Sequence, residues 1–268
     1  MGGAAAWGPS HRKPAIKLKP PSKFLMLSEW RAALEFTLGI ATIPGLLTAK
    51  RGDGHPVLVL PGFLASDLST DFLRRYLQLL GYDVYAWELG RNLGGIYSMR
   101  RKLQHRLAEI NLATGRKVTI VGWSLGGLYA RDLALTMPES VRTVITMGSP
   151  FSRDVTATNA GGLYHLLSGE SIAAVPPADL EWIAGELPMP VTSIYTKTDG
   201  IVNYHTCLLE EGKTAENIEV YASHIGLGVN PSVLWAVADR LAQPEGSFEP
   251  FVPHGPLALA YPAHDAAA

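Results

Sequence analysis

Cysteine is almost absent from this sequence of 268 residues, which contains only Cys207. A lone thiol excludes an intrachain disulfide and any metal site built from clustered cysteines. The sequence also lacks a GxGxxG or P-loop pattern, and its His, Asp and Glu residues do not cluster at the spacing of metal ligands. We therefore expect no nucleotide, no other cofactor and no bound metal.

An excess of charge of one sign is missing as well, because 23 Lys and Arg residues face 24 Asp and Glu residues and the net charge is -1. This balance gives no electrostatic reason to expect nucleic acid as a partner. The longest uncharged apolar stretch, residues 36–49, is shorter than a membrane span, which needs about 20 residues. The basic N-terminus is not followed by the long apolar core of a signal peptide, so the sequence predicts a cytoplasmic protein. The oligomeric state stays open.

Short apolar runs typical of strands buried on both faces alternate with helical patterns along most of the chain. This alternation predicts α/β architecture: a mostly parallel, doubly wound sheet of about six strands. The expected strands are residues 56–60, 82–87, 117–121, 141–147, 191–195 and 218–221, and the expected helices are 69–80, 97–113, 124–137 and 230–241.

Composition divides the chain into four regions, of which the third holds the expected sheet. They are a disordered N-terminal segment (1–22), an N-terminal helical segment (23–50), an α/β domain (51–242) and a flexible C-terminal tail rich in Pro and Ala (243–268). The N-terminal helix is expected to begin after Ser28 and to end before Pro44. It either packs on the main domain or forms a hydrophobic flap near a substrate entrance or a lipid surface.

The connection formed by residues 152–189 is much longer than the usual loop of 2–6 residues. We interpret it as a crossover helix plus a small lid. Tyr164, Leu167 and Trp182 are large enough to line an acyl pocket, and we predict that they bind substrate without supplying catalytic groups. The alternative is a structural crossover that never touches substrate.

The pentad from Gly122 to Gly126, Gly-Trp-Ser-Leu-Gly, matches G-x-S-x-G. It directly follows an expected strand and opens an expected helix, which is the setting that a nucleophile elbow requires. The turn presents Ser124 above the carboxyl edge of the sheet, where open α/β folds bind ligands. The alternative is a glycine-rich turn in which Ser124 only caps the helix.

With this elbow, and with Thr-Met-Gly-Ser-Pro at 146–150, the chain resembles the α/β-hydrolase superfamily, in particular compact serine esterases and lipases. The resemblance covers residues 56–241 and implies the α/β-hydrolase fold with the catalytic order Ser, acid, His. A hydroxyl needs an adjacent base to become a nucleophile. His224 follows the last expected strand and is the predicted base, with His205 as its rival, whereas His165 falls in the insertion.

Asp199 follows the fifth expected strand and precedes His224 by 25 residues, as the resemblance implies for the acid that orients the imidazole. Asp-Gly pairs are also ordinary turns. Asp154, after the fourth strand, is the alternative acid, and Asp132 lies on the helix after the elbow. The oxyanion hole is expected at the amides of Phe63 and Leu125.

These residues favour a serine carboxylic-ester hydrolase, an esterase or lipase that forms an acyl-enzyme on Ser124 and acts on a small-molecule or lipid ester. The same triad could transfer the acyl group to an alcohol or amine. The fold could also serve as a non-catalytic binding protein. The apolar N-terminal helix adds a peripheral contact with lipid as a further expectation.

Overall fold

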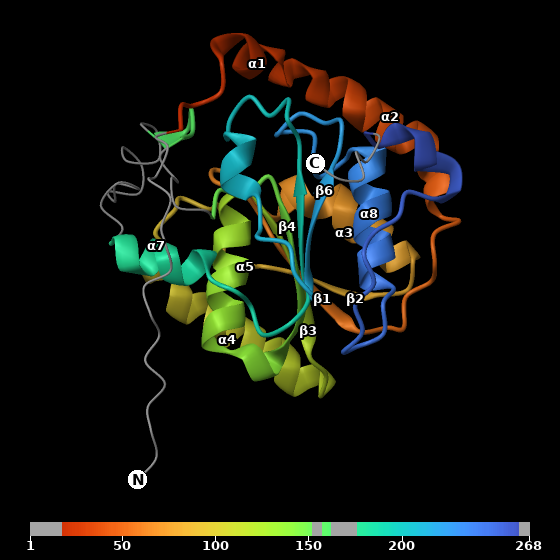
Figure 1. Ribbon diagram of the computed structural model, residues 1–268. Helices are drawn as coiled ribbons and strands as arrows, with labels where there is room; N and C mark the ends of the chain where they lie inside the picture. Colours follow the sequence, from red (N-terminus) through yellow and green to blue (C-terminus); the bar gives the residue numbers. More distant parts are fainter. Residues whose placement is uncertain (1–17, 152–156, 162–175, 263–268) are drawn as a thin grey trace.

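The computed structural model describes residues 18–151, 157–161 and 176–262. Its centre is a sheet of six parallel strands in the order β2-β1-β3-β4-β5-β6, so the predicted α/β class is confirmed (Figure 1). The four inner strands carry the mainly apolar, buried residues that a sheet covered on both faces requires, whereas the edge strands β2 and β6 are only partly buried. The strands are β1 (Pro56–Leu60), β2 (Asp83–Ala86), β3 (Val118–Trp123), β4 (Val141–Met147), β5 (Val191–Tyr195) and β6 (Ala215–Glu219).

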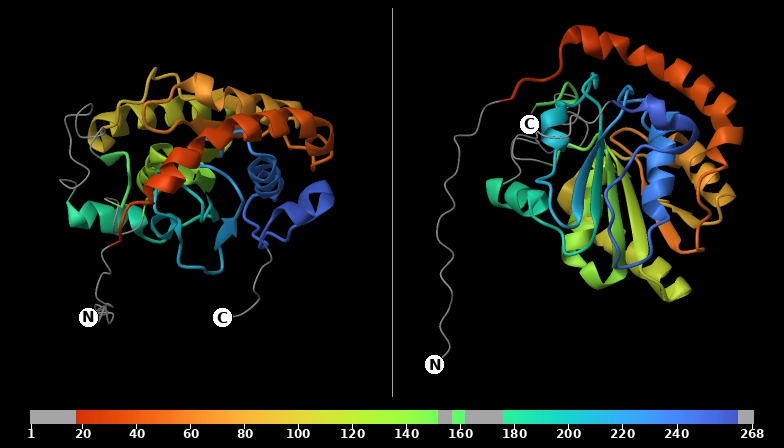
Figure 2. Two further views of the ribbon diagram at one scale, coloured as in Figure 1. Left: turned by 90° about the horizontal axis from the view of Figure 1, so that it is seen from above. Right: turned by 45° about the vertical axis from the view of Figure 1, so that its right-hand side comes forward.

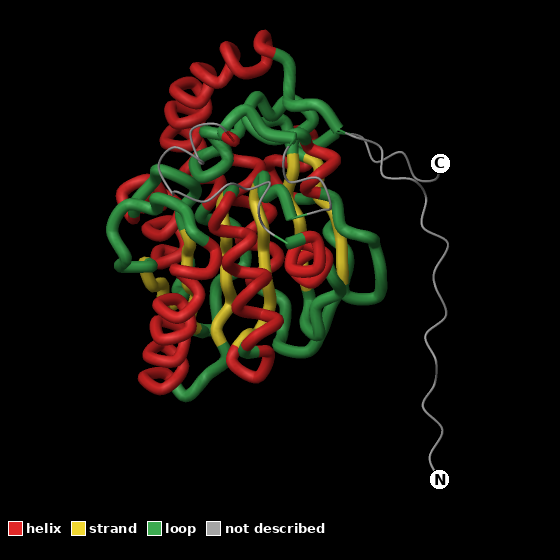
Figure 3. Tube along the Cα trace, turned by 90° about the vertical axis from the view of Figure 1, so that its left-hand side faces the viewer, coloured by secondary structure: helices red, strands yellow, loops and turns green. Residues whose placement is uncertain are grey.

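Helices cover both faces of the sheet and enclose two apolar cores. On one face α4 (Ile96–Thr114), α5 (Leu125–Thr136) and α7 (Pro177–Ala184) form a layer that Figure 3 shows in front of the strands. On the other face lie α3 (Asp71–Leu79) and α8 (Pro231–Leu241). Short 3-10 helices complete the described chain: η1 (Ser28–Arg31), η2 (Asp67–Thr70), η3 (Pro138–Ser140), η5 (Tyr204–Cys207) and η6 (Gly255–Ala260).

The N-terminal helices α1 (Lys23–Leu27) and α2 (Ala32–Leu46), with η1 between them, lie across the carboxyl edge of the sheet (Figures 1 and 2). The sequence predicted one helix that starts after Ser28 and ends before Pro44. Instead, Ser22 caps α1 by accepting a hydrogen bond from the amide of Leu25, and α2 continues past Pro44 to Leu46. Pro44 lies in the last turn of α2, so the backbone hydrogen bond that proline cannot donate is missing only near the end of the helix.

The C-terminal segment differs from the flexible tail expected from its composition. Up to residue 262 it packs on the domain, and Phe251 and Tyr261 are buried. The Tyr261 hydroxyl donates to the carbonyl of Ser232 at 2.6 Å, and the Phe251 amide donates to Glu216 at 2.7 Å. Two aromatic anchors outweigh the surrounding Pro and Ala because each buries a large apolar area.

Within these described ranges, none of the helices has both the length and the apolar composition to cross a membrane. Most of the expected disordered segment lies outside the described residues, as do half of the segment 152–189 and the last residues of the tail.

Candidate active site

Ser124 occupies the turn between β3 and α5 at the carboxyl edge of the sheet, with φ 53° and ψ -120°. A non-glycine residue with positive φ costs about 1–3 kcal/mol, which the surrounding structure must offset. The flanking glycines permit the tight turn: a Cβ on Gly122 would lie 2.4 Å from the carbonyl oxygen of Gly126. A Cβ on Gly126 would lie 2.4 Å from the carbonyl oxygen of Leu60, at the end of β1. The sequence therefore folds into an elbow with the serine at its tip.

His224 lies in the loop between β6 and α8, and its side chain contacts Ser124 at the carboxyl edge of the sheet. Its Nε2 is 3.0 Å from Ser124 Oγ, and its Nδ1 is 2.6 Å from Asp199 Oδ2. The imidazole is buried, so the two contacts fix its orientation. The structure thus brings together the three residues that the sequence predicted as a triad, from loops that follow β3, β5 and β6.

Asp199 is held by its own loop. Its Oδ1 accepts hydrogen bonds from the amides of Ile201 at 2.8 Å and Val202 at 2.7 Å, which leaves Oδ2 for the imidazole. A carboxylate that accepts several N–H donors is strongly fixed in direction. The arrangement favours the imidazole tautomer that carries its proton on Nδ1 and presents a bare Nε2 to the serine hydroxyl.

The pKa of His224 lies above its usual value. Burial alone lowers this pKa, because it disfavours the imidazolium. The charge of Asp199, its hydrogen bond to Nδ1 and the charge of Glu29 act in the opposite direction and together outweigh burial. The site is therefore built to stabilise a cation on His224, which is what a base needs after it has taken a proton.

The rival candidates lie elsewhere. His205 is exposed on η5, where its Nδ1 contacts Asn203 Oδ1 at 3.1 Å and its ring stacks on Tyr204. Asp132 is paired with Arg100 of α4 at 2.7 Å. The other two, Asp154 and His165, lie outside the described residues.

The loop after β1 lies against the serine, as the predicted oxyanion hole requires. A Cβ on Gly62 would be 3.2 Å from the Cβ of Ser124, so the backbone that leads to Phe63 passes close to the nucleophile. Leu125 is the first residue of α5, directly after Ser124. The buried side chain of Asn92 holds this loop in place, because it donates to the carbonyl of Pro61 at 2.9 Å.

Of the three predicted substrate-binding residues, only Trp182 is described, and Tyr164 and Leu167 lie outside the described residues. Trp182 is on α7 with 39% of its surface exposed, and the guanidinium of Arg100 lies 5.5 Å from its ring centre. This position is in the helical layer beside α4.

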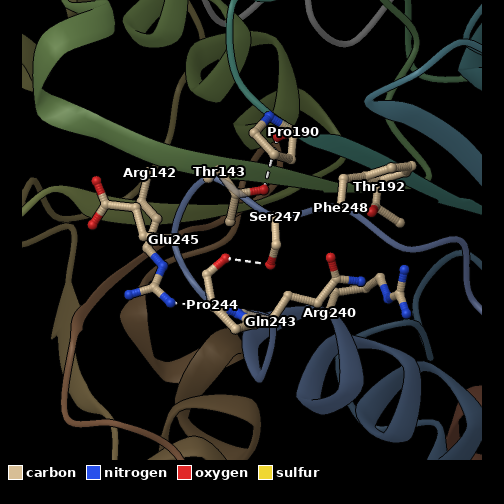
Figure 4. A pocket seen from close by; sticks show the side chains of 11 residues that line it. Arg142, Thr143, Pro190, Thr192, Arg240, Gln243, Pro244, Glu245, Ser247 and Phe248 are labelled. Atoms are coloured by element: carbon tan, nitrogen blue, oxygen red, sulfur yellow. Dashed lines mark hydrogen bonds between the residues drawn. The ribbon is translucent and has the colours of Figure 1, made fainter.

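Figure 4 shows the side chains that line a separate small cleft. Its volume is about 20 Å³. Arg142 and Thr143, at the start of β4, line it together with the chain after α8. Since Ser124 follows the end of β3, this cleft is at the opposite edge of the sheet from the triad. It has no role in the chemistry of Ser124.

Sequence reasoning did not identify Glu29 and Glu35, two buried carboxylates that contact the loops of the triad. One signal was available for Glu35, because it is the single charged residue within the apolar helix α2. An isolated acid on an apolar helix needs buried partners.

The parallel sheet, the elbow and the order Ser, Asp, His define the α/β-hydrolase fold, and the fold expected from the sequence is confirmed. Lipase B of Aspergillus fumigatus is similar with a TM-score of 0.57 and 18% identity, over 71% of this chain and 52% of that chain. The monoacylglycerol lipase of Paleococcus ferrophilus is similar with a TM-score of 0.53 and 15% identity, over 72% of this chain and 96% of that chain.

Among curated proteins, the pimeloyl-[acyl-carrier protein] methyl ester esterase of Citrobacter koseri is 33% identical to this chain over 87 residues. The aligned segment covers 32% of this chain and 30% of that esterase, so the chain matches less than a third of its relative's length. No protein-family model matches the chain.

Proposed function

We propose that the protein is a serine carboxylic-ester hydrolase. The observation that carries this proposal is the hydrogen-bonded chain from Asp199 through His224 to Ser124, with the serine on a strained elbow. Such an arrangement is the general device for turning a weak hydroxyl nucleophile into a strong one. The lipase and esterase names of the similar proteins agree with an ester as substrate.

The reaction proceeds in two halves. Nε2 of His224 takes the proton of Ser124 Oγ while the oxygen attacks the ester carbonyl and forms a tetrahedral oxyanion. The imidazolium then gives this proton to the departing alkoxide, the carbon–oxygen bond breaks and an acyl-enzyme remains. A water molecule repeats the sequence: it loses a proton to His224, attacks the acyl carbon and releases the acid as Ser124 recovers its proton.

The oxyanion is assigned to the amides of Leu125 and Phe63. The amide of Leu125 belongs to the first turn of α5, where helical N–H groups point outward and the helix dipole favours negative charge. Each well-placed donor to a tetrahedral oxyanion is worth about 3 kcal/mol of barrier. The contact between the loop of Gly62 and Ser124 supports the position of the second donor.

The N-terminal helices extend the proposal to apolar or lipid esters. Large apolar side chains on α1, η1 and α2 are exposed above the carboxyl edge of the sheet: Phe24 79%, Leu27 72%, Trp30 69%, Leu34 55%, Leu38 55% and Ile40 52%. An exposed apolar face with an aromatic residue is typical of helices that lie in a membrane interface. We propose that this face contacts lipid peripherally, and that residues 152–189 set the preference for acyl length.

A panel of p-nitrophenyl esters with short to long acyl chains tests the proposal on wild type and on Ser124→Ala. We expect hydrolysis by wild type and loss of nearly all turnover in the variant. Product analysis with an added alcohol distinguishes hydrolysis from acyl transfer, because transfer would yield a new ester in place of the acid. Ester cleavage that persists in folded Ser124→Ala would reject the proposal.

A further inference from the structure

Glu29 of η1 is a buried carboxylate at the junction of two catalytic loops. It is 4% exposed. Its Oε1 accepts hydrogen bonds from the amide of Gly200 at 2.8 Å and from the amide of His224 at 3.1 Å. Its Oε2 accepts one from the amide of Ile225 at 2.9 Å. Three N–H donors directed at two oxygens form the pattern that an ionised carboxylate accepts.

These donors belong to the two segments that must be aligned for the triad to work. Gly200 follows the acid Asp199 directly, and His224 is the base itself. The side chain of Glu29 therefore joins the loop of Asp199 to the loop of His224. Its partners Gly200 and His224 lie more than 170 positions further along the chain. Hydrogen bonds to a charged acceptor are about twice as strong as neutral ones, so this junction is stiff.

Two further residues of the same segment reinforce the junction. Arg31 donates through Nη2 to the carbonyl of Thr198 at 2.6 Å and to the carbonyl of Ala222 at 2.9 Å, so it also reaches both loops. Glu35 accepts from the amide of Ser223 at 2.7 Å.

Close contacts at two glycines show how tightly the N-terminal helices pack on these loops. A Cβ on Gly200 would lie 2.4 Å from the carbonyl oxygen of Leu25, in the middle of α1. A Cβ on Gly226 would lie 2.0 Å from the carboxylate of Glu35. Glycine is thus the residue that fits at both contacts.

We propose that Glu29 is a positioning residue of the triad: it fixes the distance between the Asp199 loop and His224 and supplies a second negative charge to the imidazole. This inference rests on the proposed serine-hydrolase function. Glu29 touches backbone amides and no reacting atom, so its effect passes through His224 and Asp199.

The electrostatic part of the inference agrees with the pKa of His224, which the charges of Asp199 and Glu29 raise against the effect of burial. The charged groups packed around the base loop are Asp199 after β5, Glu29 and Arg31 of η1, and Glu35 of α2. Removal of the Glu29 charge leaves Asp199 as the remaining source of the upward shift, so the pKa of His224 must fall.

The test is Glu29→Gln, which keeps the shape of the side chain but removes its charge and one of its acceptor oxygens. NMR titration of the His224 imidazole should give a lower pKa than in wild type. The acidic limb of kcat/KM should move to lower pH by the same amount, because the free enzyme needs a neutral His224. We expect kcat to fall about 10-fold to 100-fold through misalignment, with little change in KM.

Glu216→Gln is the matched control. Glu216 is also a buried carboxylate, but it binds Thr192, Arg240 and the amide of Phe251 near the amino end of β6. It should lower stability and leave the His224 titration unchanged. If Glu29→Gln lowers only stability, as Glu216→Gln does, with unchanged kcat and unchanged His224 pKa, Glu29 is merely structural and the inference is overturned.

Glu29→Asp keeps the test decisive if the Gln variant does not fold. Its carboxylate retains the charge but is one methylene too short for all three amides. We expect a lower kcat with a His224 pKa that remains above its usual value, whereas a wild-type kcat would overturn the positioning role. The NMR titration needs no turnover, so a protein that cleaved no ester would reject the proposed function and still report on Glu29.

Discussion

The series of hydrogen-bonded side chains Asp199, His224 and Ser124 has a counterpart at the opposite edge of the sheet. There Asp53 Oδ1 lies 2.5 Å from His55 Nδ1, and His55 Nε2 lies 3.0 Å from the hydroxyl of Thr119. Acid, imidazole and hydroxyl follow one another in the same order and at similar distances as in the candidate triad. Only the series that ends at Ser124 is proposed to be catalytic, so the differences between the two series show what catalysis requires beyond this order of groups.

Access separates the two hydroxyls. Thr119 is a fully buried residue inside β3, and its partner His55 is also fully buried. Ser124 follows the end of the same strand, where the elbow directs it out of the sheet. Ser124 is thus only five positions after Thr119, yet the Thr119 hydroxyl contacts a buried imidazole whereas that of Ser124 can reach a carbonyl carbon.

The pKa values of the two imidazoles are shifted in opposite directions. Burial lowers the pKa of His55, Asp53 acts to raise it, and the positive charges of Arg142 and Arg116 add to the lowering. The pKa of His224 is raised because its neighbours Asp199 and Glu29 are both anionic. The comparison teaches that residue types and distances alone do not make a base, because only at His224 do the anionic neighbours outweigh the effect of burial on the imidazole pKa.

Removal of each hydroxyl gives the largest contrast. Ser124→Ala should lower kcat by roughly 10³-fold to 10⁶-fold, because no nucleophile remains. Thr119→Val should keep a near wild-type kcat and lose about 1–3 kcal/mol of stability, because His55 Nε2 is left without its partner. Steady-state kinetics and urea unfolding of both variants check this pair, and a severe loss of kcat in folded Thr119→Val would contradict it.

Substitution of the two acids, Asp199 and Asp53, should give the same contrast in kcat, with a smaller difference than for the two hydroxyls. Asp199→Asn should lower kcat by about 10⁴-fold, since the imidazole loses the carboxylate that orients it. Asp53→Asn should leave kcat within about 2-fold and cost about 1 kcal/mol of stability, because Asp53 is half-exposed and solvent screens its pairs with Arg116 and Arg142. Comparable kcat values in the two variants would remove Asp199 from the triad.

The opposite pKa shifts predict that acid abolishes activity before it weakens the fold. Activity should fall as pH drops through the raised pKa of His224, above the usual 6.5. In that window protonation of His224 favours the folded state, since its folded pKa exceeds its unfolded one. The lowered pKa values of His55 and Asp53 act the other way: their stabilisation is lost only as pH falls below about 6.5 and about 4, respectively.

Profiles of kcat/KM and of the urea midpoint against pH check this order. The acidic limb of activity should be fully reversible and should lie at higher pH than the loss of stability. Coincident limbs would mean that activity follows unfolding and not the titration of His224.

The smallest effect is expected for His205→Ala. The side chain is exposed on η5 and contacts Asn203 and Tyr204, so kcat should change by less than about 2-fold. His224→Ala, assayed beside it, should lose activity about as severely as Ser124→Ala. Equal losses in the two histidine variants would reassign the base.

Local pattern was sufficient to predict five strands and the elbow, because each depends on a few neighbouring residues, whereas the sixth strand, expected at 218–221, begins at Ala215 in the more polar segment before that apolar run. The order of the loops then predicted Asp199 and His224. Glu29 could not be predicted, because its partners lie 171 to 196 positions further along the chain and no periodicity reports such a contact. The packing of Phe251 and Tyr261 was missed for the same reason, since composition cannot indicate what two aromatic residues find to pack against.

The junction of residues 29, 200 and 224 also has a consequence for biosynthesis. Residue 29 leaves the ribosome long before its partners His224 and Ile225, which are made after nearly the whole sheet has been synthesised. A growing chain that has reached the loop after β5 contains Ser124, Asp199 and Glu29 but not yet His224. The proposed triad can therefore assemble only when the last strand and the loop that follows it have been added.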